Sequence, residues 1–311
     1  MDRKSKKSEK KIAQGLITFF LILAVSVIAA HAVFRRSPLN SFIMISLEVM
    51  ALVFMGFILL VWMRIFLLTI IARRKFALTL EYPVDISGSE KISIIVPARN
   101  EERNIRRCLQ SLRKIEYPNV EIIVVNDRST DRTAQIIAEF AKLDSRVKLI
   151  QGKDFKDGWS GKIHAIHQGV LNACGDWFLF IDADVAIHEK APAIALSYCL
   201  RNELKVLSTS LRPSLESFWE NIIMPVVFIA IGFSSPPERV NDPDDEAALA
   251  NGGFIFVNAK SYRAIGGFEA IKDAIQEDVA FARLAKSKKV PYRFMRGQEM
   301  GTQRWYTSFR Q

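Results

Sequence analysis

Two carboxylates stand one residue apart in the stretch FLFIDADVAIH, residues 178–188. Asp182 and Asp184 follow a run of apolar and aromatic residues that is typical of a buried strand. Side chains two positions apart in an extended chain point to the same side. Paired carboxylates suit a hard divalent cation such as Mg²⁺ or Mn²⁺, which can neutralise the charge of a departing diphosphate. The pair therefore predicts a metal site for a nucleotide diphosphate at the end of a strand.

Polar residues also follow the other predicted strands of the same sheet. A lone acid at a strand end is most often a turn or a helix cap, but three acidic strand ends on one rim are harder to explain in that way. The chain has no GxGxxG after the first strand and no GxxxxGK[ST], so it carries neither a dinucleotide fingerprint nor a P-loop. The further candidates on this rim are Pro97, Arg99, Asn100, Glu101, Asn126, Asp127 and Asp131.

The residues after position 90 alternate between β-branched runs and helical spacing. Asn100 is the expected N-cap of the first helix, and a later helix is expected from 160 to 172. This alternation predicts an α/β fold with a parallel sheet, in which ligands bind at the carboxyl ends of the strands. The expected strands are 91–98, 120–127, 146–151 and 176–182.

The net charge of +10 is concentrated at the N-terminal end of the chain. Residues 1–75 hold 12 Lys or Arg against three acids, whereas the remaining residues hold 31 against 30. A nucleic-acid groove would need the basic residues on the folded domain. We therefore expect a membrane partner for the basic end and no nucleic acid.

Two apolar runs precede the alternating region. Residues 12–34 contain no charged side chain and residues 42–63 contain only Glu48, so both are expected to span a membrane. A cleavable signal peptide is the alternative for the first run. Lys and Arg flank the pair of spans, which predicts a multi-pass cell-membrane protein whose remaining part is cytosolic. The expected division is a basic N-terminus at 1–11, a two-helix hairpin at 12–72, a linker at 73–90 and an α/β domain at 91–311.

A third apolar run, residues 222–233, is too short to cross a membrane. It predicts either a helix of the core or a helix that lies in the membrane interface, and the flanking Phe218 and Trp219 favour the interface.

Six stretches of the sequence, which follow one another in the family's order, resemble the family 2 glycosyltransferases, which have the GT-A fold. Singly each is a weak motif, but together they cover roughly residues 91–306. The segment 240–254 is most similar to the branch with the hopanoid-associated and carotenoid-type membrane enzymes. The stretches are SIIVPARNEERNIRRCLQSL, YPNVEIIVVNDRSTDRTAQI, DGWSGKIHAIHQG, FIDADVAIH, NGGFIFVNAKSYRAIGGFEAI and IQEDVAFARLAK.

The resemblance implies a role for each matching residue. Asp127 would recognise the nucleotide base, Lys162 would lie near the diphosphate, and Asp184 would ligate the divalent cation beside Asp182. Asp278 would be the catalytic base of an inverting transfer, although an acid pair at a helix start is by itself more often a helix-terminus feature. The implied donor side is Pro97, Ala98, Arg99, Glu101, Asp127, Lys162 and Asp182, and the implied acceptor side is Asn251, Gly252, Gly253 and Glu277.

The implied activity is transfer of a sugar, UDP-linked as is usual in the family, to a lipid or lipid-linked acceptor at the cytosolic membrane face. Processive synthases carry Q-x-x-R-W, but the position three before Arg304 is Gly301, which opposes processive synthesis. A catalytically silent membrane scaffold is the alternative of another class. Members of the suggested branch usually continue into further membrane segments at the C-terminus. The domain at 91–311 is therefore expected to be either C-terminally truncated or a form of the family that lacks those segments.

Overall fold

The computed structural model describes residues 49–64, 75–85, 89–154 and 158–304. The chain divides into two compact units, residues 1–68 and 69–311. In the first unit the described part is a helix at 49–64, which overlaps the second predicted span, 42–63. The first predicted span, 12–34, lies outside the described residues. Across the described ranges, no helix has both the length and the apolar character that a membrane crossing requires.

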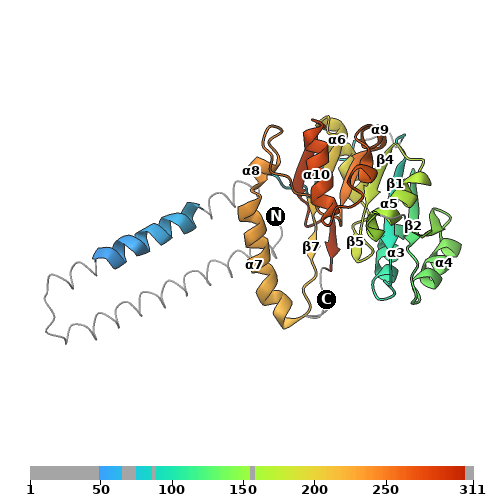
Figure 1. Ribbon diagram of the computed structural model, residues 1–311, viewed down its shortest axis with the longest axis horizontal. Helices are drawn as coiled ribbons and strands as arrows, with labels where there is room; N and C mark the ends of the chain where they lie inside the picture. Colours follow the sequence, from blue (N-terminus) through green and yellow to red (C-terminus); the bar gives the residue numbers. More distant parts are fainter. Residues whose placement is uncertain (1–48, 65–74, 86–88, 155–157, 305–311) are drawn as a thin grey trace. The chain divides into compact units, whose positions relative to one another are not determined.

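A seven-stranded sheet forms the centre of the second unit (Figure 1). Its order is β3-β2-β1-β4-β8-β6-β9, in which β8 is antiparallel to both of its neighbours and the other pairs are parallel. The predicted α/β fold with a mostly parallel sheet is therefore confirmed. The strands are β1 (Ile92–Ala98), β2 (Val120–Asn126), β3 (Val147–Gln151), β4 (Trp177–Phe180), β6 (Val206–Ser210), β8 (Ile255–Asn258) and β9 (Tyr292–Arg296).

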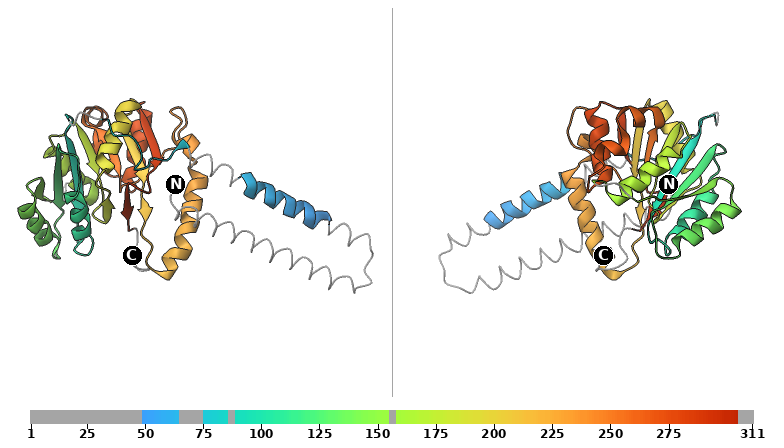
Figure 2. Two further views of the ribbon diagram at one scale, coloured as in Figure 1. Left: turned by 180° about the vertical axis from the view of Figure 1, so that it is seen from behind. Right: turned by 45° about the vertical axis from the view of Figure 1, so that its right-hand side comes forward.

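Helices cover both faces of this sheet (Figure 2). Ile94 of β1 packs in the cluster with α3, α4 and α6, whereas its neighbour Ile95 packs in the cluster with α5, α9, η1 and α10. Burial on both faces explains why the parallel strands read as continuous apolar runs. The helices are α3 (Ile105–Arg113), α4 (Thr133–Leu143), α5 (Gly161–Leu171), α6 (Ala191–Arg201), α8 (Pro237–Val240), α9 (Ala259–Ala264), the 3₁₀ helix η1 (Gly267–Ile271) and α10 (Glu277–Ser287).

A small second sheet has the order β5-β10-β7. β5 (Val185–Ile187) begins directly after Asp184 and is antiparallel to β10 (Gly301–Gln303). β10 is in turn parallel to β7 (Arg212–Pro213). This pairing places Gln303 opposite Val185, next to the two predicted metal ligands.

The segment before the predicted domain start also packs on the large sheet. Phe76 and Leu78 are buried, and Ala77 forms a bridge with Arg296 of β9. The Leu78 N–H donates to the Arg296 carbonyl over 2.9 Å. Part of the region expected as a linker, 73–90, therefore contributes to the core.

The expected helix start at Asn100 is wrong. α3 begins at Ile105, and Asn100 has a φ of +55° in a loop. The Asn100 N–H donates to Ser129 Oγ over 3.0 Å, and its Oδ1 accepts from the Thr130 N–H over 2.9 Å. These partners belong to the loop after β2, so the polar side chain joins two loops of the rim and caps no helix.

The third apolar run forms α7 (Phe218–Ser234) on the surface of the unit. Its start is fixed by a capping box, in which Ser217 and Glu220 exchange hydrogen bonds between side chain and backbone. Met224 is its buried residue, whereas Val226 is 64% exposed and Phe233 is 61% exposed. The alternative of a core helix is therefore wrong.

Candidate active site

The carboxyl ends of β1, β2 and β4 border one open pocket of about 420 Å³. This volume lies within the usual range of small-molecule sites. The pocket brings together every residue that the sequence assigned to the donor side and to the metal. Its lining consists of Pro97, Ala98, Arg99, Glu101, Asp127, Gly161, Lys162, Ala165, Asp182, Ala183 and Asp184.

Asp127 forms one end of this pocket and is held by its surroundings. Its N–H donates to the Ala98 carbonyl over 2.8 Å, which joins the ends of β1 and β2. The side chain is buried, and its Oδ1 accepts from Arg128 Nε over 2.9 Å. Arg99 Nη1 lies 3.8 Å from the other oxygen, Oδ2. One carboxylate oxygen is therefore closely paired within the protein, and the second is only loosely paired.

Asp184 lies at the other end with a buried oxygen that has no partner among the described residues, Oδ1. Burial, together with the neighbouring Asp182 and Glu101, raises the pKa of Asp184 to about 7. An ionised carboxylate in this position needs a cation, and the donor set of Asp184 and Asp182 fits Mg²⁺ or Mn²⁺. No third His, Cys or acidic ligand joins them in the described part of the chain. Mg²⁺ is commonly held by one or two carboxylates, with phosphates and waters completing its shell.

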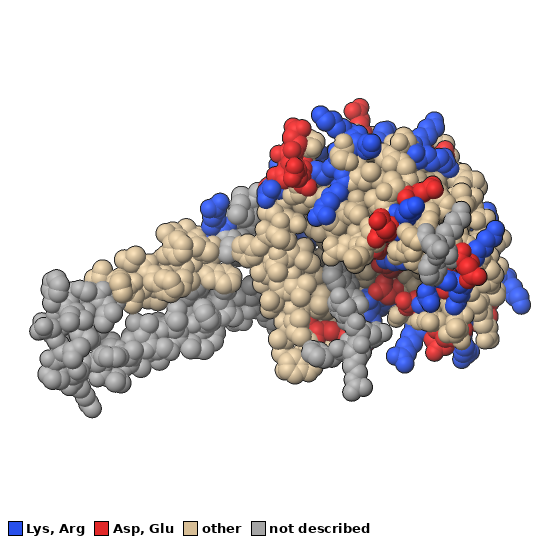
Figure 3. All heavy atoms as spheres, viewed as in Figure 1, with Lys and Arg blue, Asp and Glu red and all other residues tan. Residues whose placement is uncertain are grey.

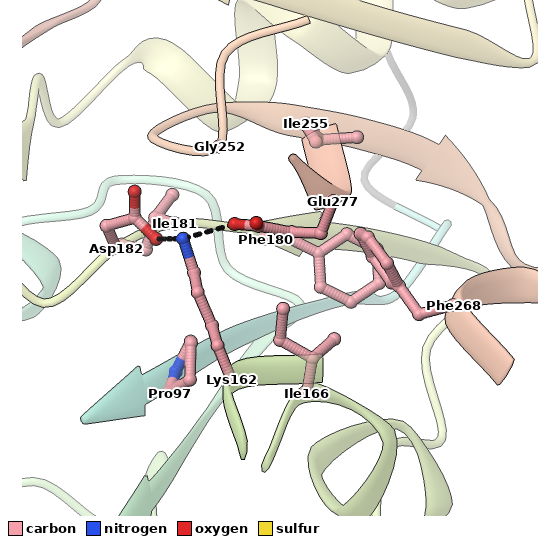
Figure 4. Close-up of a pocket in the computed structure, with 10 residues that line it drawn as sticks. All are labelled: Pro97, Lys162, Ile166, Phe180, Ile181, Asp182, Gly252, Ile255, Phe268 and Glu277. Carbon is pink, nitrogen blue, oxygen red and sulfur yellow. Dashed lines mark ion pairs between the residues drawn. The ribbon is translucent and has the colours of Figure 1, made fainter. Parts of the chain in front are cut away.

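Lys162, from the first turn of α5, lies between the carboxylates of Asp182 and Glu277 (Figure 4). Its Nζ is 2.7 Å from Asp182 Oδ1 and 2.6 Å from Glu277 Oε1. Burial lowers the pKa of Lys162, but the two carboxylates outweigh burial and raise the pKa above its usual value. Beside this ammonium group the protein leaves a hollow of about 10 Å³, which is room for little more than a water molecule. We therefore take the larger pocket as the ligand site.

The residues predicted for the acceptor side meet at the start of α10. The Gly252 N–H donates to Asp278 Oδ2 over 3.1 Å, and burial raises the pKa of Asp278 above the usual value of a carboxyl group. Asn251 uses both ends of its amide within the loop, since Oδ1 accepts from the Gly253 N–H and Nδ2 donates to the Thr209 carbonyl. Asn251 therefore shapes the loop, while Asp278 is the acid that the loop backbone holds.

Gln303 is a site residue that the sequence did not single out. It is buried on β10, and its Nε2 donates to Asp182 Oδ2 over 3.4 Å. A Cβ at Gly253 would lie 2.6 Å from Gln303 Oε1, so a larger residue at this position would have to displace the Gln303 side chain. In the sequence, Gln303 stands directly before Arg304, a spacing that does not match the Q-x-x-R-W motif. The pairing of β10 with β5 brings it to the site.

The glycosyl transferase family 2 model matches residues 93–223 of this chain. A 4,4'-diaponeurosporenoate glycosyltransferase of Staphylococcus aureus (strain bovine RF122 / ET3-1) is 32% identical over 209 residues, which are 65% of this chain and 53% of that protein. The same enzyme from strain USA300 is 32% identical over 207 residues, with 64% and 52% covered. The chain thus spans about half the length of the curated relatives it matches.

Two solved structures are similar in fold. The mannosyltransferase PcManGT from Pyrobaculum calidifontis, in complex with GDP-Man and Mn²⁺, has a TM-score of 0.51 and 19% identity, covering 74% of this chain and 62% of that chain. TarS of S. aureus has the same TM-score and identity, covering 69% of this chain and 37% of that chain. At this identity the likeness concerns the fold alone, and it agrees with the expected GT-A-like arrangement.

The buried carboxyl of Asp184 predicts a measurable pH effect on stability. Its pKa is about 7 in the folded protein, against about 3.9 in an unfolded chain. Between these values the folded state binds a proton that the unfolded state has lost, so wild-type stability falls as pH rises through this window. In EDTA, Asp184→Asn should melt at a higher temperature than wild type at pH 8, and the difference should shrink at pH 5.

Mn²⁺ provides the matching control. At pH 8 it should raise the melting temperature of the wild-type protein and leave that of Asp184→Asn nearly unchanged, because a bound ion stabilises only a fold that holds it. An equal response of both proteins to Mn²⁺ would contradict a cation site at Asp184.

Proposed function

Because the match over residues 93–223 places the chain in glycosyltransferase family 2, we propose that it transfers a sugar from a nucleoside diphosphate donor to a lipid-like acceptor, with inversion. The observation that supports this best is the pocket itself. It holds Asp127, the proposed base-binding acid, and Asp184, an acid without a counter-cation, at the carboxyl ends of β2 and β4, the strands on either side of β1. Such edges of open α/β sheets are where nucleotides commonly bind.

The charge pattern around Asp127 favours a uracil base. Arg128 already occupies Oδ1, which leaves Oδ2 as the oxygen that can accept from a ligand once Arg99 moves aside. Uracil presents a single N–H between two carbonyl groups, and the carbonyls can accept from the neighbouring guanidinium groups. Guanine presents two adjacent donors and would use both carboxylate oxygens. We therefore propose a UDP-sugar as the donor.

A divalent cation at Asp184 and Asp182 would supply positive charge to the departing diphosphate when it is bound. The chain's own residues do the remaining work. Lys162 supplies a second positive charge beside Asp182, and the Gly252 N–H holds Asp278 at the acceptor side. Asp278 can then take the proton of an acceptor hydroxyl as that oxygen attacks the sugar from the side opposite the diphosphate.

The acceptor proposal rests on α7 and on the relatives. The name of the 32% identical proteins gives a carotenoid acid as their acceptor, which is a long apolar molecule. Figure 3 shows α7 as a surface with few charged side chains, and its exposed residues include Trp219 and Val226. The helix begins shortly after β7, the strand that pairs with β10 beside the site. We propose that α7 lies in a membrane interface, with the runs at 12–34 and 42–63 as anchors, and brings a lipid acceptor to the site.

The base assignment predicts which nucleotide binds. With Mn²⁺ present, UDP should raise the melting temperature of the protein more than GDP does. Asp127→Asn should lose most of the UDP effect because the amide offers a weaker acceptor to the uracil N–H. Asp154→Asn is the matched control, since Asp154 lies 3.8 Å from Arg128 and its side chain is 97% exposed. An equal or larger shift with GDP would contradict the uracil proposal.

The role of Asp278 predicts a loss confined to turnover. Asp278→Asn keeps the shape but cannot take a proton, so UDP release with a lipid acceptor that reacts through a hydroxyl group should fall about 10²–10⁴-fold. UDP affinity, measured by calorimetry, should stay nearly unchanged, because the base acts only in the transition state. A carboxylate acceptor is already ionised and needs no base, so the loss should apply to hydroxyl acceptors. Normal turnover with a hydroxyl acceptor would assign the base to another residue.

The interface proposal predicts contact between α7 and lipid. The emission of Trp219 is the difference between the emission of the wild-type protein and that of Trp219→Phe. This emission should be strongly quenched in vesicles of brominated phosphatidylcholine relative to vesicles of unbrominated phosphatidylcholine. Trp159→Phe is the control, because Trp159 packs against the rings of His164 and His167 and should be shielded from lipid. Quenching of the Trp219 contribution that is no stronger than that of the Trp159 contribution would contradict the interface proposal.

A further inference from the structure

The ammonium group of Lys162 lies where the donor side and the acceptor side meet (Figure 4). Its two carboxylate partners come from different elements, Asp182 from the segment after β4 and Glu277 from the first position of α10. Lys162 itself belongs to the first turn of α5. One cation therefore joins three elements that are distant in the sequence.

Lys162, Asp182 and Glu277 form an ion-pair triad, and Gly252 lies next to it. A Cβ at this position would lie 3.3 Å from Asp182 Oδ2, 3.4 Å from Lys162 Nζ and 3.7 Å from Glu277 Oε1. The Gly252 N–H is the group that donates to Asp278. The ammonium group and its two carboxylate partners therefore pack against the loop at Gly252. Through the hydrogen bond from Gly252 they also influence the position of Asp278.

The triad is partly buried, but a bound donor would compete with Glu277 and Asp182 for the ammonium group of Lys162. The side chains of Glu277, Asp182 and Lys162 are 16%, 22% and 38% exposed, so water screens the charges in part, but they interact more strongly than fully exposed pairs do. Lys162 also lines the larger pocket, where a diphosphate would attract the same ammonium group. Glu277 lies on the acceptor side of Lys162 and opposes its withdrawal into that pocket.

We propose that Glu277 is a positioning residue that acts through Lys162. This inference rests on the proposed sugar transfer and adds a role for the first acid of the Glu277–Asp278 pair. Glu277 keeps the ammonium group between the donor and Gly252 after the diphosphate binds, so that Asp278 stays aimed at the acceptor. It therefore contributes to turnover and not to donor affinity.

Steady-state kinetics separate this role from direct donor binding. Glu277→Gln should lower kcat roughly 10–100-fold, the scale on which a slight misplacement of catalytic groups reduces rates. The KM for the donor should stay the same or fall, because one negative charge near the diphosphate is removed. Lys162→Met should both lower kcat and raise the KM for the donor. Asp273→Asn, which removes an exposed charge shortly before α10, is the control and should change neither constant.

A thermal double-mutant cycle tests the ion-pair triad without any turnover. Lys162→Met leaves Asp182 and Glu277 facing each other without a cation, so adding Glu277→Gln should relieve part of the drop in melting temperature. Additive shifts would overturn the proposal, as would coupled shifts with an unchanged kcat in Glu277→Gln. If the wild-type protein released nucleotide from no nucleotide sugar, the proposed function would fail and the role of Glu277 with it, whereas the cycle would still establish the triad.

Discussion

Five carboxylates, those of Glu101, Asp182, Asp184, Glu277 and Asp278, gather around the ammonium group of Lys162 at one edge of the sheet. Lys162 contacts two of them directly, and burial raises the pKa of Asp184 and of Asp278. Such a concentration of acid is costly unless positive charge arrives with a ligand or moves within the site. The proposed cation, the proposed donor and the positioning role of Glu277 are all consequences of this imbalance.

The fold creates the imbalance through strand pairing. β1 pairs in parallel with both β2 and β4, so the loops after the three strands emerge at the same edge. The antiparallel strand β8 then returns beside β4, and the loop that precedes it carries Gly252 to the same place. The second sheet adds Gln303 through the register between β10 and β5. Residues that are far apart in the sequence therefore meet because their strands end together, while buried apolar strands keep the edge fixed.

The sequence predicted the parts of this arrangement that depend on local pattern. The β-branched runs located β1 to β4, and the rule that ligands bind at the carboxyl ends of parallel strands located the donor pocket. What it could not predict depends on distant partners. Asn100 is of a residue type that often caps helices, but its hydrogen bonds go to Ser129 and Thr130 in another loop. The apolar run of α7 has no polar face from which burial could be read, and Gln303 reaches the site only through strand register.

We propose that the edge pocket binds a nucleoside diphosphate with its base at Asp127 and its cation at Asp184. A crystal structure of the protein with UDP and Mn²⁺, using the anomalous scattering of manganese, tests this claim most directly. We predict a manganese peak within ligand distance of an Asp184 oxygen and a uracil N–H that donates to Asp127 Oδ2. A manganese peak away from Asp184, or a uracil ring that does not contact Asp127, would contradict the account.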